Sequence, residues 1–273
     1  MSEPVNISNE QEAAKAFSKQ SSVFDELYTP NTIVQYKRER VRKVVEELVR
    51  PGSTILELNA GTGEDATYFA TKGYKVHATD IAEGMLKELR TKVKNKGLDN
   101  KVSTELCSYT QMAELKNKGP YDLIFSNFAG LNCTGELSKV LHSFKPLLKP
   151  GGRVVLVILP SFCLWETLML FRGKFKTAFR RWGTKNGRTA YVEGVPFKCW
   201  YYDPSFIIST LKNDYNVIGL EGLCTIVPPS YIEHFAERHT RLFNFLKKWE
   251  EKLKNKWPWK SIGDYYIISL KLK

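Results

Sequence analysis

A glycine-rich turn between a strand and a helix constrains the fold of this chain most. Residues 54–58 form a short apolar run, Thr-Ile-Leu-Glu-Leu, which predicts a buried strand. Gly61 and Gly63 follow it, and a helix is expected over 64–72, with Gly73 at the position of a helix C-cap. A strand that enters a helix through such a turn is typical of α/β proteins, so we expect further strand–helix units.

The rest of the chain repeats this alternation. The further strands are expected over 74–79, 102–106, 121–126, 153–159, 217–227 and 265–272, and the further helices over 85–96, 136–148, 204–211 and 231–254. The pattern predicts an α/β fold: a doubly wound, seven-stranded, mostly parallel, Rossmann-like sheet with helices on both faces.

The ends of this pattern set the expected domain organisation. Residues 1–20 are polar, which predicts a flexible N-terminal segment. Residues 21–273 are expected to form one domain, beginning with helices over 22–49 that Pro30 divides. An aromatic and basic insertion at about 161–203 interrupts the alternation after the fifth strand. We expect this insertion to bind the acceptor of whatever reaction the domain performs.

Composition narrows the compartment. No apolar run approaches the length of a membrane-spanning helix, and the N-terminus carries Glu3, Glu10 and Glu12, unlike a secretory signal. The five cysteines have no C-x-x-C spacing, so neither a zinc site nor a disulfide framework is expected. We therefore expect a cytoplasmic protein without a metal, with contact to the inner face of the membrane as an open alternative.

The chain is strongly basic. It has 41 lysines and arginines against 29 acidic residues, a formal net charge of +12. Such an excess fits a nucleic acid, an anionic membrane surface, an acidic substrate or simply a solvated basic surface. Because no nucleic-acid-binding motif accompanies the charge, nucleic acid is not expected as a partner.

Charge also bears on the ligand of the glycine turn. The run from Gly61 to Ala66 satisfies the dinucleotide pattern G-x-G-x-x-G/A, in which a helix N-terminus holds the pyrophosphate. Glu64 and Asp65 at this helix start would repel phosphate, although carboxylates also stabilise a first helical turn. Glu57, inside a buried strand, needs a partner. S-adenosylmethionine, which has a sulfonium and an α-ammonium and no phosphate, fits these acids better.

A further acid supports a nucleoside ligand. Asp80 follows Gly63 by 17 residues, at the carboxyl end of the second expected strand. A carboxylate at that place can accept hydrogen bonds from both ribose hydroxyls. The alternative role for Asp80 is to cap the helix that follows.

With these residues the chain resembles the class I S-adenosylmethionine-dependent methyltransferases, in the small-molecule group that includes the ubiquinone/menaquinone-type enzymes. The resemblance covers about residues 50–160 and is carried by the turn at 57–63, Asp80, the strand 121–126 and the run 148–152. It implies S-adenosylmethionine as the cofactor and S-adenosylhomocysteine as the product. The expected cofactor-binding residues are Glu57, Asn59, Ala60, Gly61, Thr62, Gly63, Asp80, Ile81, Met85, Ser108, Tyr109, Asn127, Phe128 and Tyr36.

The sequence departs from this family at two places. Asn59 replaces the first glycine of the turn, and asparagine tolerates the positive φ that this position requires. The family often has an acid after the third strand that contacts the adenine amine, where this chain has Cys107-Ser108-Tyr109. We expect Ser108 or the backbone to make that contact and Tyr109 to cover the adenine face.

The acceptor side is less determined. The segment 162–182 is rich in aromatic residues and ends in basic ones, which predicts a lid over the active site, a helix docked on an anionic membrane, or both. We expect a hydrophobic small-molecule or lipid-like acceptor, O- or C-methylated by in-line displacement with positioning as the main catalytic effect. His234 and Tyr202 are the candidate general bases, outside the sheet. A cofactor-binding module without catalysis and an NAD(P)-dependent reductase remain the alternatives.

Overall fold

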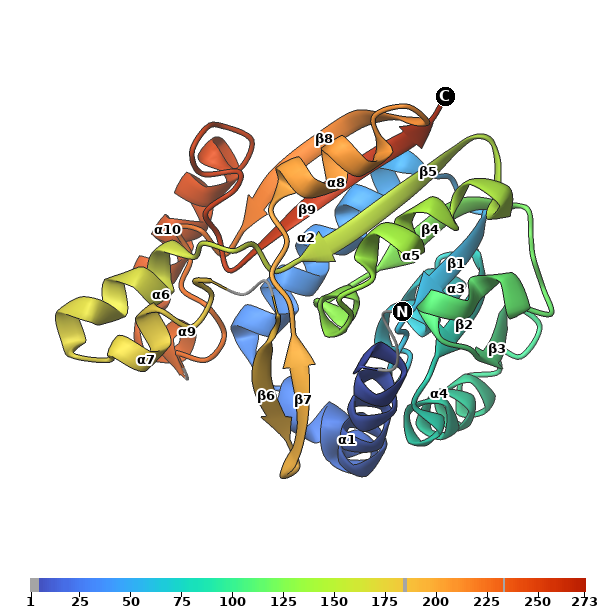
Figure 1. Cartoon of the computed structure of the whole chain (residues 1–273), viewed down its shortest axis with the longest axis horizontal. Coiled ribbons are helices and arrows are strands. Elements are labelled where there is room, and N and C mark those ends of the chain that lie inside the picture. The colour runs from blue at the N-terminus through green and yellow to red at the C-terminus, as the bar shows by residue number, and fades with distance from the viewer. Residues whose placement is uncertain (1–4, 184–185, 233) are drawn as a thin grey trace.

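A seven-stranded sheet forms the centre of the computed structural model, which describes residues 5–183, 186–232 and 234–273 (Figure 1). The strand order is β3-β2-β1-β4-β5-β9-β8, and all pairs are parallel except those that β9 makes with β5 and β8. The strands are β1 (Thr54–Leu58), β2 (Lys75–Asp80), β3 (Val102–Leu106), β4 (Tyr121–Ser126), β5 (Leu148–Ile158), β8 (Tyr215–Leu223) and β9 (Tyr265–Leu272). The predicted doubly wound fold is confirmed.

Helices cover both faces of the sheet, because successive residues of its strands point to opposite sides. Ile55 packs in a core with Val45 and Leu89, whereas its neighbour Leu56 packs in a second core with Leu141. The first face carries α2 (Thr32–Leu48), α3 (Glu64–Thr71) and α4 (Glu83–Asn95), and the second carries α5 (Leu137–His142) and α8 (Pro204–Leu211). Short 3₁₀ turns are η1 (Tyr109–Glu114), η2 (Gly130–Cys133) and η3 (Lys145–Leu147).

The strand order reverses between β1 and β4, and this reversal positions the candidate site. The chain leaves β1 toward β2 on one side and enters β4 on the other. In open α/β sheets a crevice forms at the carboxyl ends of the strands at such a switch point. The glycine turn after β1 and the segment after β4 both lie there.

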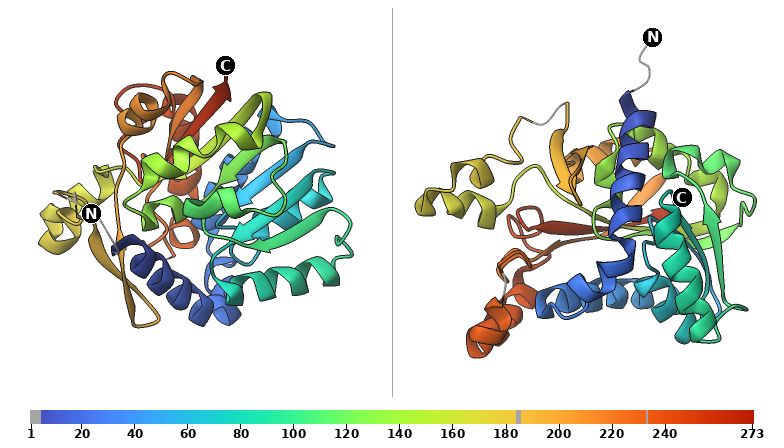
Figure 2. Two further views of the ribbon diagram at one scale, coloured as in Figure 1. Left: turned by 45° about the vertical axis from the view of Figure 1, so that its right-hand side comes forward. Right: turned by 90° about the horizontal axis from the view of Figure 1, so that it is seen from below.

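The N-terminal segment differs from the expectation of a flexible stretch over residues 1–20. Helix α1 (Val5–Tyr28) packs against α4 and against a hairpin strand, as Figure 2 shows. Ala13 and Ala16 are buried against Cys133 and Phe197. The helix is therefore held by long-range contacts that its polar composition does not reveal. Residues 1–4, with Glu3, lie outside the described part of the chain.

The segment 162–182, expected as a lid over the active site or a helix docked on a membrane, is not one continuous helix. It contains α6 (Leu164–Leu168), η4 (Met169–Arg172) and α7 (Phe175–Ala178), interrupted at Gly173, whose φ is 67°. A hairpin that the sequence did not predict follows, with strands β6 (Arg188–Val192) and β7 (Val195–Cys199). Glu193 and Gly194 both have positive φ, which a tight hairpin turn requires.

The C-terminal helix expected over 231–254 is likewise divided. It consists of α9 (Phe235–Arg238) and α10 (Thr240–Leu253). His239 separates them because its backbone is not helical, with φ −129° and ψ 47°. α10 lies at the same end of the molecule as the insertion helices α6 and α7 (Figure 1), and it lines an apolar groove together with α6.

Candidate cofactor-binding site

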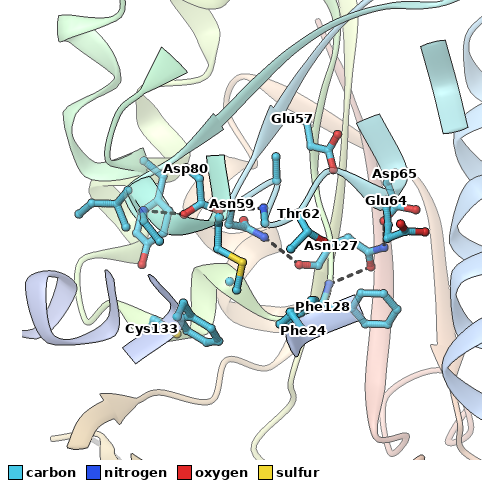
Figure 3. Close-up of a pocket in the computed structure, with 18 of the residues that line it drawn as sticks. Phe24, Glu57, Asn59, Thr62, Glu64, Asp65, Asp80, Asn127, Phe128 and Cys133 are labelled. Carbon is cyan, nitrogen blue, oxygen red and sulfur yellow. Dashed lines mark hydrogen bonds between the residues drawn. The ribbon is translucent and has the colours of Figure 1, made fainter. Parts of the chain in front are cut away.

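A cavity of about 140 Å³ lies at the carboxyl ends of β1, β2 and β4 (Figure 3). Residues of the glycine turn, of the turns after β2 and β4, and of helices α1 and α2 surround it. Those that the sequence predicted are Glu57, Asn59, Ala60, Gly61, Thr62, Asp80, Ile81, Met85, Tyr109, Asn127 and Phe128. The sequence pattern therefore brings most of the expected cofactor-binding residues to one place.

The glycine turn keeps its shape although asparagine occupies its first position. Asn59 has φ 47°, in the left-handed region. Its amide nitrogen donates to the Asn127 carbonyl at 2.9 Å, and its amide oxygen accepts from the Ser126 hydroxyl at 2.6 Å. Gly63 starts α3 with φ 78°, and a Cβ there would lie 2.4 Å from Leu89 Cγ. Asn59 thus ties the turn to β4, whereas Gly63 is required sterically.

Asp80 does not cap α4, whose N-cap residue is Ala82, but its carboxylate accepts backbone hydrogen bonds and faces the cavity. Its Oδ2 accepts from the Gly61 backbone N–H and its Oδ1 from the Ala82 backbone N–H, both at 2.8 Å. Burial raises the pKa of Asp80, and these backbone hydrogen bonds oppose the rise. A carboxylate oxygen accepts more than one hydrogen bond, so Asp80 can also accept from ligand hydroxyls. Of the two roles considered for Asp80, helix capping is contradicted by this geometry, and binding of the ribose stays a prediction.

Glu57 lines the cavity with a carboxyl oxygen that has no partner among the described residues. The side chain of Glu57 is buried, and this oxygen is its Oε2. Burial, and then the charge of Asp65, raise the pKa of Glu57 well above its ordinary value, against the opposing effect of Arg38 and Arg42. A buried polar atom without a partner is costly. A cationic ligand group, such as the α-ammonium of S-adenosylmethionine, fits this oxygen.

Asp65 and Glu64, by contrast, are already paired. Asp65 accepts from Arg38 at 3.1 Å, Arg42 at 2.7 Å and Asn127 at 2.8 Å. Burial alone would raise the pKa of Asp65, but the two arginines hold it below its ordinary value. Glu64 pairs with Lys92. Because basic side chains neutralise both acids, they repel a phosphate less than expected. The argument against a dinucleotide therefore depends on Glu57.

Arg38 is the main cavity residue that the sequence did not predict. It is 6% exposed, lines the cavity, and its Nε has no partner among the described residues. Its guanidinium carbon lies 5.0 Å from the centre of the Phe128 ring. The signal was present in the sequence, because Arg38 stands on the helix face formed by Val34, Val41 and Val45. A charge on an apolar face needs a partner; Asp65 pairs with one nitrogen of Arg38, and its Nε is left for a further acceptor.

Other expected residues lie beside or away from the cavity. Gly63 and Ser108 adjoin residues that line it, and the Ser108 side chain is buried. Tyr36 is not at the cavity. It packs with Phe243 in a separate core, and its hydroxyl accepts from Arg40 at 3.1 Å. Its contact with the cofactor is therefore not supported by this geometry.

Neither candidate base reaches the cavity. His234 is exposed at the start of α9 with φ 56°. The Tyr202 hydroxyl donates to the Thr134 carbonyl at 2.5 Å, and burial raises its pKa. Tyr202 lies instead in a second groove, which is lined by Ser161, Phe162, Arg181, Trp182, Gly183, Trp200, Tyr201 and Tyr202. Their roles stay predictions.

One cluster in the insertion has the residue types of a metal site. Single ligand atoms of Cys163, Glu166 and Asp264 lie within 4.8 Å of one another. Arg181, however, bonds Glu166 at 2.6 Å and Asp264 at 2.8 Å. These carboxylates are therefore partners of a buried arginine, and we assign the cluster a structural role.

Comparison with known proteins identifies the central segment. Residues 55–152 match the family model of a methyltransferase domain. The match covers 98 of the 273 residues, so this segment is similar to a methyltransferase domain. A demethylmenaquinone methyltransferase of Lactococcus lactis is 29% identical over 180 residues, covering 63% of this chain and 66% of that protein. A ubiquinone/menaquinone biosynthesis C-methyltransferase of Cupriavidus metallidurans is 31% identical, covering 48% and 53%. The chain thus spans about half to just under two thirds of these relatives.

Solved structures extend the match in fold to the whole chain. The 1,6-didemethyltoxoflavin-N1-methyltransferase of Burkholderia thailandensis, solved with its substrate and S-adenosylhomocysteine, superposes with a TM-score of 0.62 at 14% identity. The match covers 100% of this chain and 92% of that one. The DhpI–S-adenosylhomocysteine complex has a TM-score of 0.58 at 12% identity. At this identity the likeness concerns the fold, and the predicted class of fold is confirmed.

Proposed function

We propose that this protein is a methyltransferase that transfers the methyl group of S-adenosylmethionine to a hydrophobic small-molecule or lipid-like acceptor, by C- or O-methylation. The observation that carries the proposal is the pair of unsatisfied groups in the cavity, Glu57 Oε2 and Arg38 Nε. The first suits the α-ammonium and the second the α-carboxylate of an amino acid, and Asp80 suits the ribose. An amino acid joined to a nucleoside fits all three.

The cofactor supplies a methyl group that its sulfonium already activates. The residues of this chain then have to hold the cofactor and orient the acceptor in line, which alone accounts for a large part of a rate enhancement. Phe128 and Ala129, after β4, have φ 47° and 62°, so the backbone at the cavity is strained. We assign this segment to the methionine portion and the methyl group. Tyr202 and His234 remain the proposed bases for a phenolic or enolic acceptor.

The acceptor class is supported from two sides. The similar proteins above are named for quinone biosynthesis, whose compounds are hydrophobic rings. The groove at Tyr202 is also lined by Phe162, Trp182, Trp200 and Tyr201, side chains that suit a flat apolar ring. We therefore propose that the insertion at about 161–203 binds the acceptor.

Calorimetric titration tests the cofactor. S-adenosylhomocysteine should bind, whereas NAD and NADP should not, because their pyrophosphate would face Glu57. Measurable binding of NAD(P) without S-adenosylhomocysteine would support the reductase instead. Transfer of labelled methyl from S-adenosylmethionine to a demethylated quinone distinguishes an enzyme from a module that only binds.

We also propose peripheral membrane contact through residues 162–182, together with α10. Phe171 is 87% exposed and Phe175 62% exposed, and on α10 Phe245 is 55% exposed. An apolar groove joins the two segments, lined by Leu164, Trp165, Leu168, Thr225, Ile226, Phe245, Leu246, Trp249 and Trp259. Among the helices of the described residues, none is long and apolar enough to cross a membrane.

Charge around this surface favours an anionic lipid leaflet. Residues 162–182 contain five lysines and arginines and one acid, and residues 240–260 contain seven and two. Apolar side chains surrounded by cations are typical of proteins that dock on anionic membranes.

Liposome sedimentation tests the membrane contact. The protein should pellet with vesicles that contain phosphatidylglycerol and remain in solution with phosphatidylcholine alone. Replacing Phe171 and Phe175 by serine should reduce the pelleted fraction severalfold. Tyr191→Ser, at a 70% exposed aromatic outside this surface, is the matched control. Equal pelleting of all three proteins would contradict the contact.

A further inference from the structure

Helix α1 presents one face to the cofactor cavity. Ala13, Phe17 and Phe24 stand at helical spacing on this face, and all three line the cavity. Glu10 lies one turn before Ala13 on the same face. A buried carboxylate at this position needs an explanation, because a polar residue at a buried helix face is costly unless it has partners.

Only half of the Glu10 carboxylate has partners. The side chain is 3% exposed, and its Oε2 accepts from the Ser108 hydroxyl and from the Thr110 hydroxyl, the latter at 2.9 Å. Its Oε1 is buried and has no hydrogen-bond partner among the described residues. Burial and, to a smaller extent, the charge of Glu136 raise the pKa of Glu10, and the side chains of Ser108, Thr110 and Thr134 oppose this rise. A hydrogen-bond donor is therefore missing at Oε1.

The position of this oxygen indicates which donor it awaits. Asp80 ends β2, and β3 is the next strand outward in the sheet. If the ribose lies at Asp80, the base attached to it extends toward the end of β3, where Ser108 and Tyr109 follow. Tyr109 lines the cavity there. The group nearest Glu10 is then an edge of the base.

We propose that Glu10 accepts a hydrogen bond from the 6-amino group of the cofactor adenine, so that α1 forms part of the cofactor site. This inference rests on the proposed function. The turn after β3, Cys107-Ser108-Tyr109, holds no acid of its own. The carboxylate arrives instead from a helix about a hundred residues earlier in the chain, positioned by Ser108.

A specificity follows from this assignment. Hypoxanthine has an oxygen in place of the 6-amino group. This oxygen is a hydrogen-bond acceptor and would face the carboxylate of Glu10, which also accepts. Sites built to bond a ligand donor strongly disfavour the analogue that lacks it. The protein should therefore distinguish S-adenosylhomocysteine from S-inosylhomocysteine.

Calorimetric titration of the full chain with these two ligands is the test. The wild-type protein should bind S-adenosylhomocysteine at least about tenfold more tightly, the equivalent of one lost charged hydrogen bond. Glu10→Gln should reduce this preference to within about threefold, because a carboxamide can donate to the 6-oxygen as well as accept. Ser108→Ala removes the hydroxyl that positions the Glu10 carboxylate and should reduce the preference for S-adenosylhomocysteine partly. Glu12→Gln, on the same helix, is the control and should leave the preference unchanged.

The possible results separate this inference from the proposed function. If Glu10→Gln weakens both ligands equally, Glu10 only holds α1 in place and the inference is overturned. If the wild-type protein binds both ligands equally well, the inference also fails while the proposed function stands. If it binds neither, the proposed function itself is wrong. Circular dichroism melting curves show whether each variant is folded.

Discussion

Two buried glutamates show opposite arrangements of a carboxylate. Glu250, on α10, is 1% exposed, and its Oε1 accepts from Arg40 at 3.3 Å and from the Cys224 backbone N–H at 2.6 Å. Its Oε2 accepts from the backbone N–H groups of residues 225–227. Glu57, on β1, is 3% exposed, yet its Oε2 has no partner in the described part of the chain.

This difference distinguishes buried charged groups that stabilise the fold from those that are available to bind a ligand. The charge of Glu250 is compensated by donors from α2 and from the segment after β8, so both oxygens of its carboxylate are satisfied without a ligand. The carboxylate of Glu57 lines a cavity and retains a free acceptor. Arg181, with its bonds to Glu166 and Asp264, belongs to the first type, and Arg38, with its free Nε, to the second. Unsatisfied buried groups at a cavity are the positions where a ligand completes the fold.

The largest expected effect is on stability, at Glu250. Glu250→Ala should lower the free energy of unfolding by about 3–5 kcal/mol, because it leaves the backbone N–H groups of residues 224–227 without their acceptor and removes one of the two buried carboxylates that pair with Arg40. Urea denaturation measures this loss. Glu251→Ala, at a neighbouring exposed acid, should cost about 0–1 kcal/mol and is the control. A loss at Glu250 no larger than at Glu251 would remove the distinction between the two types of buried glutamate.

At Asp80 the effect should appear in binding instead. Asp80→Ala should weaken the binding of S-adenosylhomocysteine by about 1–3 kcal/mol, since hydrogen bonds from the ribose hydroxyls are lost. Isothermal titration calorimetry gives the number. An unchanged affinity would mean that Asp80 serves only the backbone N–H groups of Gly61 and Ala82.

For Arg38 the expected loss is of similar size but depends on the ligand. Arg38→Met should weaken the binding of S-adenosylhomocysteine by about 1.5–3 kcal/mol, because the carboxylate of the ligand loses a charged partner. 5′-Methylthioadenosine has neither carboxylate nor ammonium and should bind both proteins alike. If both ligands lose the same affinity, Arg38 does not contact the carboxylate. It would then act on the shape of the cavity through its ion pair with Asp65.

The smallest effect is the dependence of stability on pH at Glu57. Its pKa in the folded protein is raised above the ordinary value of 4.5. The contribution of Glu57 to stability is therefore full below pH 4.5 and is lost as the pH rises through the folded pKa. The loss is about 1.4 kcal/mol for each unit by which the folded pKa exceeds the unfolded pKa. Glu57→Gln should lose less stability than the wild-type protein as the pH is raised in a series of melting curves. Parallel curves would contradict this.

The same contrast explains what the sequence could predict. The strands 54–58, 102–106 and 121–126 were predicted at their observed bounds, because the alternation of buried strands and helices is a local pattern. Most cavity residues followed, since parallel strands bring their carboxyl ends to one edge.

What failed depends on long-range contacts. Helix α1 is polar and is held by packing against distant segments, so neither its role nor that of Glu10 could be predicted from local pattern. Arg38 did carry a readable signal, a charge on an apolar helix face. The hairpin β6–β7 stands outside the sheet and so has no share in the alternation.

The most direct test of the proposed cofactor site is whether Glu57 accounts for a preference for ligands that carry an α-ammonium group. S-adenosylhomocysteine and its analogue without the α-amino group are titrated into the wild-type protein and into Glu57→Gln. The wild-type protein should prefer S-adenosylhomocysteine by at least about tenfold, and the variant should lose most of that preference while binding the analogue unchanged. The same preference in both proteins, or no binding of S-adenosylhomocysteine at all, would contradict the assignment of Glu57 to the α-ammonium.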